Sequence, residues 1–266
     1  MSTRIEVEHI DSIADVKLAR PDKLNAMDTD MFTSIIDTAK SINDDPSIRV
    51  VVLSGQGKGF CAGLDVESIM PELAEAGSLL AESDESPANF VQRSAWIWRE
   101  IRVPVIAAVH GPAFGAGLQL ALGADIRIVA PDARLSLREI HWGLIPDIAV
   151  TQTVRHTVPL DVAKELSFTG REVSGEEAVG LRLATSVSEN PHAAAMDLAR
   201  EIAGRSPDAV QRCKALWNRA PYASVSEGLA MEAALQKELI GGVNQQEAVF
   251  ANIQKRQPKF QDPNLG

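Results

Sequence analysis

Three continuous apolar runs alternate with helix-like segments in the first half of the chain. The runs are Arg49–Leu53, Pro104–Val109 and Asp125–Val129. A strand that is apolar at successive positions is covered on both faces, which is typical of a parallel sheet with helices packed against it. Strand and helix recur about every 20 to 30 residues, so the pattern predicts stacked β-α units and an α/β fold.

Further elements are predicted around these runs. Two short alternating segments, Ile5–Ile10 and Ile13–Ala19, indicate a β-hairpin. Apolar residues recur at helical spacing over about Asp28–Ile42, which predicts an amphipathic helix. Two further helices, Phe90–Ile101 and Phe114–Leu122, are expected between the strands. After about residue 155 the chain is almost wholly helical, with capping-box sequences that begin at Ser174 and Ser224 and one short strand at Ala184–Val187.

One acidic segment differs from the rest of the chain. From Gly59 to Gln92 there is no Lys or Arg. Residues 77–88 combine Gly, Ser, Pro and acidic residues, which favours a loop over packed structure. Two interpretations are open, a solvated surface loop or a lid over a pocket that residues 67–90 partly build.

Length and charge exclude several classes of protein. The 266 residues suffice for one large domain, or for one domain with an appended helical piece. A net charge of −10 argues against wholesale nucleic-acid binding. No apolar stretch approaches the roughly 20 residues that span a bilayer, and the start lacks the apolar core of a signal peptide. We therefore expect a cytoplasmic protein without membrane or nucleic-acid partners.

Standard cofactor and metal signatures are also missing. The glycine-rich run Gly55–Gly59 has Phe60 where a dinucleotide fingerprint needs its third glycine, and it lacks P-loop spacing. The five histidines are scattered without ligand spacing, and Trp96 and Trp98 are explained by packing. Cys61 and Cys213 are expected to be reduced, partly buried thiols rather than a disulfide or a metal site.

Three stretches combine small residues with carboxylates. Phe60–Asp65 follows the first buried strand, and Gly115-Ala116-Gly117 follows the second and opens a helix. Small residues let a ligand approach the backbone, and a helix start offers unpaired N–H groups. The amides of Leu64 and Ala116 are therefore expected to converge on one carbonyl oxygen. The third stretch supplies two carboxylates, Glu139 and Asp147, of the kind that moves a proton to and from an enolate.

In order along the chain, these stretches resemble the enoyl-CoA hydratase/isomerase (crotonase) family. Arg20–Met27 is similar to that family's R-P-x-x-x-N-A-[LM], and Ala62–Asp65 to its A-G-x-D. The glycine turn at 115–117 and the tail Lys255–Phe260 continue the likeness, which covers nearly the whole chain.

The resemblance implies a crotonase-like spiral of repeated β-β-α units with a helical C-terminal trimerisation region. On that basis, residues 1–200 would form the core with the thioester site and residues 201–266 the oligomerising region of a homotrimer, or of a hexamer that pairs two trimers. The substrate would be an acyl-CoA thioester, so coenzyme A enters with the substrate and no separate cofactor or metal is expected. Matched positions for binding it are Lys23, Ala62, Gly63, Asp65 and Lys255, although either lysine is equally explained as a solvated surface charge.

The catalytic positions decide among reactions. The family's hydratases use two glutamates, one matched by Glu139 and the other by Gln119, and an amide is neither an acid nor a base at neutral pH. Hydratases usually carry a small residue in a G-A-G-G-like turn where this chain has Asp147. A carboxylate there resembles the dienoyl-CoA isomerase branch, which has an aspartate in place of Gln119. Asp147 is otherwise explained as a helix N-cap.

The resulting hypothesis is an enzyme that shifts double bonds in unsaturated acyl-CoA, either of the dienoyl type with Glu139 and Asp147 or of the Δ3,Δ2 type with Glu139 alone. One alternative is an enoyl-CoA hydratase that uses Glu139 and a water held by Gln119. Another is a non-catalytic acyl-CoA-binding protein.

Overall fold

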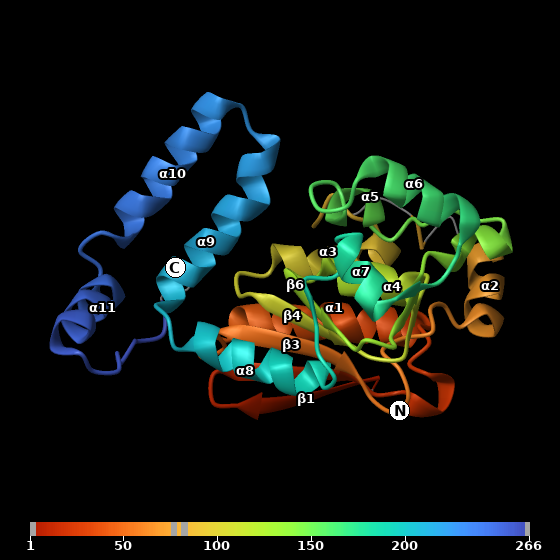
Figure 1. The fold of residues 1–266 in the computed structure, drawn as a ribbon, viewed down its shortest axis with the longest axis horizontal. Coiled ribbons are helices and arrows are strands. Elements are labelled where there is room, and N and C mark those ends of the chain that lie inside the picture. The colour runs from red at the N-terminus through yellow and green to blue at the C-terminus, as the bar shows by residue number, and fades with distance from the viewer. Residues whose placement is uncertain (1–3, 76–78, 81–84, 264–266) are drawn as a thin grey trace.

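A six-stranded sheet forms the centre of the molecule (Figure 1). The computed structural model describes residues 4–75, 79–80 and 85–263. The first two strands pair as the predicted antiparallel hairpin, and every later pairing in this sheet is parallel. Its strands, in spatial order, are β1 (Ile5–Ile10), β2 (Ile13–Leu18), β3 (Val50–Gly55), β4 (Val105–Val109), β6 (Ile126–Val129) and β9 (Ser186–Val187).

Helices cover both faces of this sheet, as the apolar runs predicted. Within β3, Val51 and Leu53 pack into a large core that also receives the first and third helices. The alternate residues Val50 and Val52 face the eighth helix instead. The helices of the core are α1 (Thr29–Asp44), α2 (Val66–Glu75), α3 (Phe90–Glu100), α4 (Ala116–Gly123), α5 (Val150–Thr153), α6 (Leu160–Thr169), α7 (Gly175–Gly180) and α8 (Pro191–Ala203), with 3-10 turns η1 (Pro21–Lys23) and η2 (Arg138–Trp142).

A second sheet of three very short strands was not predicted. It consists of β5 (Pro112–Phe114), β7 (Arg134–Ser136) and β8 (Val173–Ser174). The prediction that a helix begins at Phe114 is therefore wrong, because Phe114 ends β5 and donates its N–H to the Cys61 carbonyl. Gly115 then turns the chain with a φ of 50°, and the helix begins at Ala116.

The acidic segment is partly helical, which corrects the expectation of a loop over residues 67–90. Helix α2 begins when the N–H groups of Ser68 and Ile69 bond to the Asp65 carbonyl, and the buried Ile69 side chain fixes it on the core. Residues 76–78 and 81–84, on which the lid interpretation depends, lie outside the described residues.

Three helices at the end of the chain extend from the core as a C-terminal arm, residues 207–254 (Figure 1). They are α9 (Pro207–Arg219), α10 (Val225–Leu239) and α11 (Val243–Gln254), with η3 (Ala220–Tyr222) between the first two. The buried Lys214 on α9 fixes the arm by donating to the carbonyls of Trp98 and Val103, at 2.7 and 2.8 Å, and by pairing with Asp125.

Smaller expectations have mixed outcomes. Ser224 begins α10 with the predicted capping box, whereas Ser174 caps α7 with only half of that arrangement, a bond from the Glu177 N–H. Trp98 is fully buried. The thiols differ from expectation, since Cys61 is fully buried and Cys213 is exposed, and neither forms a disulfide. Among the described helices, none is long and apolar enough to cross a bilayer.

Candidate active site

The backbone around Cys61 pairs with β5, next to the two amides that were expected to converge. The Cys61 N–H donates to the Pro112 carbonyl, and the Phe114 N–H donates back to Cys61, both at 3.0 Å. Two glycines permit this contact. A Cβ on Gly117 would lie 2.4 Å from the Cys61 carbonyl oxygen, and one on Gly63, where φ is 100°, would lie 2.8 Å from that of Phe114.

The N–H groups of Leu64 and Ala116 are unpartnered within the described part of the chain. Ala116 is the first residue of α4, and the Cβ position of Gly63 lies 3.9 Å from the Ala116 nitrogen. Two unpaired amides near each other, one of them at a helix start, form a site that polarises a carbonyl oxygen.

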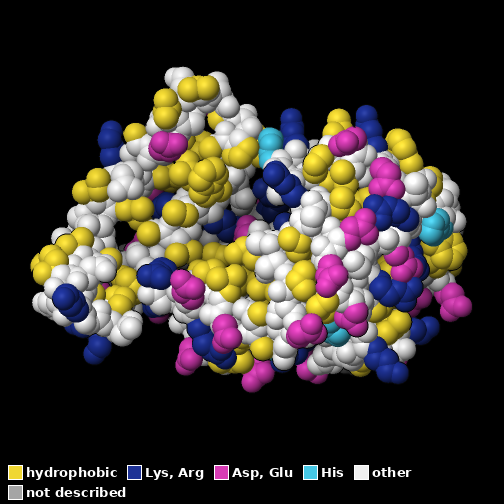
Figure 2. All heavy atoms as spheres, in the orientation of Figure 1, with side chains coloured by type: hydrophobic (Ala, Val, Ile, Leu, Met, Phe, Trp, Pro, Cys, Tyr) yellow, Lys and Arg dark blue, Asp and Glu magenta, His cyan; other side chains and the backbone are white. Residues whose placement is uncertain are grey.

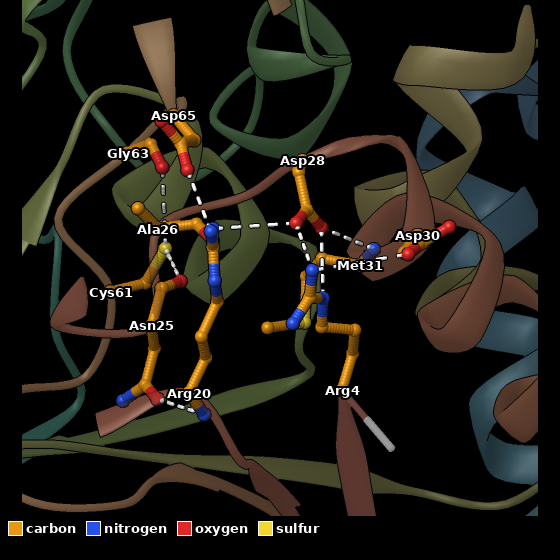
Figure 3. A network of polar contacts seen from close by, with 10 residues as sticks. All are labelled: Arg4, Arg20, Asn25, Ala26, Asp28, Asp30, Met31, Cys61, Gly63 and Asp65. Atoms are coloured by element: carbon orange, nitrogen blue, oxygen red, sulfur yellow. Dashed lines mark hydrogen bonds and ion pairs between the residues drawn. The ribbon is translucent and has the colours of Figure 1, made fainter. Parts of the chain in front are cut away.

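Arg20 supports the segment that carries Leu64 (Figure 3). Its guanidinium pairs with Asp65 at 2.8 Å and with Asp28, the N-cap of α1, at 3.4 Å. Arg4 pairs with Asp28 from the other side. Sequence reasoning assigned Asp65 to substrate binding, but its carboxylate already has Arg20 as a partner, so the assignment stays a prediction. Arg20 begins the Arg20–Met27 motif, but its supporting part in the site is evident only from its ion pairs.

Glu139 lies on η2, and it is only 9% exposed. The Gln119 side chain donates its Nε2–H to Glu139 Oε1 at 2.6 Å. The other oxygen, Oε2, is buried without a hydrogen-bond donor from the described residues. Burial raises the pKa of Glu139 and the Asp147 charge adds to the rise, while the Gln119 hydrogen bond acts in the opposite direction. A Cβ on Gly115 would lie 3.0 Å from Oε1, so the carboxyl lies beside the start of α4.

Asp147 does not cap a helix, which removes the structural explanation that its sequence context offered. Helix α5 begins after Ala149, whose backbone is left-handed at φ 58°. Asp147 is exposed as a residue, yet desolvation raises the pKa of its carboxyl. Its charge contributes to the raised pKa of Glu139, so the two predicted carboxylates lie within electrostatic range of each other.

Comparison with known proteins decides the family. Residues 8–263 match the model of the enoyl-CoA hydratase/isomerase family. The chain belongs to the enoyl-CoA hydratase/isomerase family. It is 32% identical over 258 residues, 94% of this chain and 92% of the relative, to the peroxisomal Delta(3,5)-Delta(2,4)-dienoyl-CoA isomerase of Arabidopsis thaliana. It is 31% identical to the short-chain-enoyl-CoA hydratase of Clostridium acetobutylicum, with 92% of each chain covered.

Solved structures confirm the crotonase fold of this hydratase/isomerase family member. The enoyl-CoA hydratase of Bacillus anthracis superposes with a TM-score of 0.89 at 27% identity, covering 98% of this chain and 100% of that one. Because isomerases and hydratases both appear among the relatives, overall likeness does not separate the two reactions, and the residues of the site must do so.

The two lysines matched to family positions lie apart. Lys23 is exposed at the end of η1, directly before Leu24, whose carbonyl accepts the Ala62 N–H. Lys255 is the exposed C-cap of α11, at the opposite end of the molecule from α2 (Figure 1). One chain therefore does not bring Lys255 to the site of this family member, and the binding roles of both lysines, Ala62 and Gly63 stay predictions. The described residues contain no cluster of three or more His, Cys, Asp or Glu suited to a metal ion.

Proposed function

We propose that this enzyme of the hydratase/isomerase family moves double bonds in unsaturated acyl-CoA thioesters. One observation carries the proposal: Glu139 is a buried carboxylate with one oxygen lacking a donor, beside the helix start that exposes the Ala116 amide. The dienoyl-CoA isomerase relative supports it. Asp147, a second carboxylate with a raised pKa and within electrostatic range of the first, favours proton transfer along a conjugated chain.

The reaction would proceed by proton transfer alone. The thioester oxygen accepts hydrogen bonds from the N–H groups of Leu64 and Ala116. This polarises the carbonyl and makes a nearby C–H of the acyl chain acidic. Glu139 Oε2 takes that proton, and the electron pair of the broken C–H bond delocalises onto the thioester oxygen as a dienolate. Asp147, or Glu139 itself, then returns a proton to a carbon further along the chain. Only the position of a proton and of the double bonds changes.

Both ends of the Gln119 amide already make hydrogen bonds, which makes hydration the less favoured reaction. Its oxygen accepts the Ile148 N–H at 2.7 Å, and one of its N–H groups donates to Glu139. The amide itself is no carboxylate, so it cannot accept the proton of a water placed there. A hydratase would have to work with Glu139 alone or with help from Asp147.

A thioester screen distinguishes these reactions. We would incubate 2-enoyl-, 3-enoyl- and 3,5-dienoyl-CoA with the protein in ¹⁸O-labelled water and in D₂O. Isomerisation predicts deuterium on carbon without ¹⁸O, and hydration predicts stable ¹⁸O at C3.

Glu139→Gln should abolish turnover, and near-wild-type activity in that variant would refute the assignment. Asp147→Asn should abolish 3,5-dienoyl turnover only if the enzyme is of the dienoyl type. Binding of every thioester without product would indicate the non-catalytic alternative.

We further propose that the C-terminal arm joins copies of this chain into a homotrimer, or a hexamer of paired trimers. Large apolar side chains of the arm are exposed in the single chain, and Figure 2 has hydrophobic side chains gathered over it. The occupant we infer is a second copy, whose Lys255 would then approach the coenzyme. Light scattering gives the mass, and Phe250→Asp should reduce it to that of a monomer. The exposed apolar side chains of the arm are Trp217, Val225, Leu229, Ile240, Val243, Val249, Phe250 and Ile253.

A further inference from the structure

Gln119 joins η2, which carries Glu139, to the turn that carries Asp147. It lies on α4 with no exposed surface. Its Nε2 donates to Glu139 Oε1 at 2.6 Å, and its Oε1 accepts the Ile148 N–H at 2.7 Å. Ile148 follows Asp147 directly, so one side chain contacts the Glu139 carboxylate and the backbone next to Asp147.

The partners permit only one orientation of this amide. A carboxylate oxygen accepts and a backbone N–H donates, so rotating the amide by half a turn would set oxygen against oxygen and N–H against N–H. The buried Ile148 N–H would also lose its acceptor. The hydrogen-bond pattern therefore fixes which atom of Gln119 faces which loop.

The same contacts distinguish the two oxygens of Glu139. Oε1 is held by Gln119, while Oε2 has no donor among the described residues. The turn beyond Asp147 also needs support, because Ala149 holds a left-handed conformation that a residue with a Cβ adopts only when its surroundings impose it. The Ile148 bond to Gln119 anchors this turn one residue earlier.

We infer that Gln119 is the positioning residue for both carboxylates. It holds Glu139 so that Oε2 is the atom that exchanges a proton with the substrate, and it holds the 146–149 turn so that Asp147 stays beside Glu139. The proton-exchange part rests on the proposed function, whereas the positioning does not. Among the described residues, Asp147 is the charged group that acts on Glu139, and it stays unchanged in the variants below.

The test follows Glu139 directly, without substrate. With ¹³C-labelled glutamate carboxyls, the Glu139 signal is the one that Glu139→Gln removes, and its titration is followed by NMR. Gln119→Leu keeps the approximate size and removes both hydrogen bonds. Because the lost bond favours the ionised form, the Glu139 titration should move to higher pH by about one pH unit. Gln211→Leu on α9, a buried glutamine outside the site, is the matched control and should leave it unchanged.

Turnover supplies a second readout. In Gln119→Leu the acid limb of kcat should move upward with the Glu139 titration, and kcat should fall roughly 10- to 100-fold with KM nearly unchanged, as expected when a base is misplaced. A folded Gln119→Leu variant with an unshifted Glu139 titration would overturn the inference. A shifted titration in a protein that turns over no thioester would instead overturn the proposed function and leave the positioning role intact.

Gln119→Glu keeps the test decisive if the leucine variant does not fold. It retains an acceptor for the Ile148 N–H and replaces the donor to Glu139 by a carboxylate oxygen. Two carboxyls in contact share one proton, so positions 119 and 139 should titrate in two well-separated steps. Titration of both in one step near the ordinary glutamate range would overturn the contact.

Discussion

Arg20 and Asp65 form an ion pair of 2.8 Å in which both side chains are nearly buried, at 13% and 10% exposed. The pair joins the start of α2 to the residues before α1 and thereby supports the Leu64 amide between them. Arg20→Met would leave the carboxylates of Asp65 and Asp28 without this partner. We expect a loss of about 3 kcal/mol in the free energy of unfolding, measured by urea denaturation.

A surface pair provides the control for Arg20. Arg200 pairs with Asp197, and both side chains are mostly exposed, at 57% and 77%. Arg200→Met should change the free energy of unfolding by less than about 0.5 kcal/mol. Equal losses in the two variants would mean that the Arg20 pair is an ordinary surface contact.

Gly117→Ala should damage activity through the backbone. The new Cβ would lie 2.4 Å from the Cys61 carbonyl oxygen, so one of the two segments must move and the amides of Leu64 and Ala116 would separate. We expect about 1–3 kcal/mol lower stability. We also expect a lower kcat/KM on the preferred thioester, even after the activity is corrected for the fraction of folded protein.

Gly180→Ala is the matched control, because nothing lies within 4 Å of its Cβ position at the end of α7. This variant should be neutral, or more stable by up to about 1 kcal/mol. If Gly117→Ala behaves like Gly180→Ala, the two segments do not touch as described.

Glu139→Gln should stabilise the protein at neutral pH. The folded-state pKa of Glu139 is raised, mainly by burial, so its contribution to stability is complete below the unfolded-state pKa and is lost as pH rises through the folded-state pKa. A neutral glutamine avoids that loss and still accepts from Gln119. Thermal unfolding should show a gain of about 0.5–2 kcal/mol at pH 7 that shrinks toward pH 4. A gain that is constant with pH would contradict this account.

Asp15→Asn should have the opposite effect. Asp15 is 1% exposed on β2 and accepts from His192 and Lys17. Burial alone raises its pKa, but these two partners lower it overall. Its stabilisation is therefore present above the unfolded-state pKa and lost as pH falls through the folded-state pKa. We expect the variant to be about 1–3 kcal/mol less stable at pH 7, with a smaller difference in acid, by urea denaturation at each pH.

The sequence predicted elements whose burial leaves a local pattern. Strands β3, β4 and β6 were evident because both of their faces are covered, which makes successive residues apolar. Strands β5 and β7 were missed because three residues carry no period, and contacts with distant segments form them. Helix α2 was missed because Pro71 and the acidic residues obscure the helical pattern of apolar residues in its sequence.

The candidate site divides in the same way. Glu139, Asp147 and the two amides were predicted from motifs of the chain, and their catalytic roles stay predictions. Neither the partner of Gln119 nor that of Asp65 was predicted, because Gln119 reaches an amide 29 residues away and Arg20 reaches a carboxylate on another segment. Such pairings depend on how distant segments pack together, and the local periodicity of the sequence carries no information about that.

The burial of Cys61 determines how the protein can be labelled. Desolvation raises the pKa of its thiol to about 12, and the thiol donates to the Asn25 carbonyl. At pH 7 to 8 it therefore offers almost no thiolate to a maleimide. Cys213, the other cysteine of the chain, is exposed on α9. The natural sequence thus accepts a single fluorophore on α9, which allows energy-transfer measurements between copies of the chain while the buried Cys61 thiol stays unlabelled.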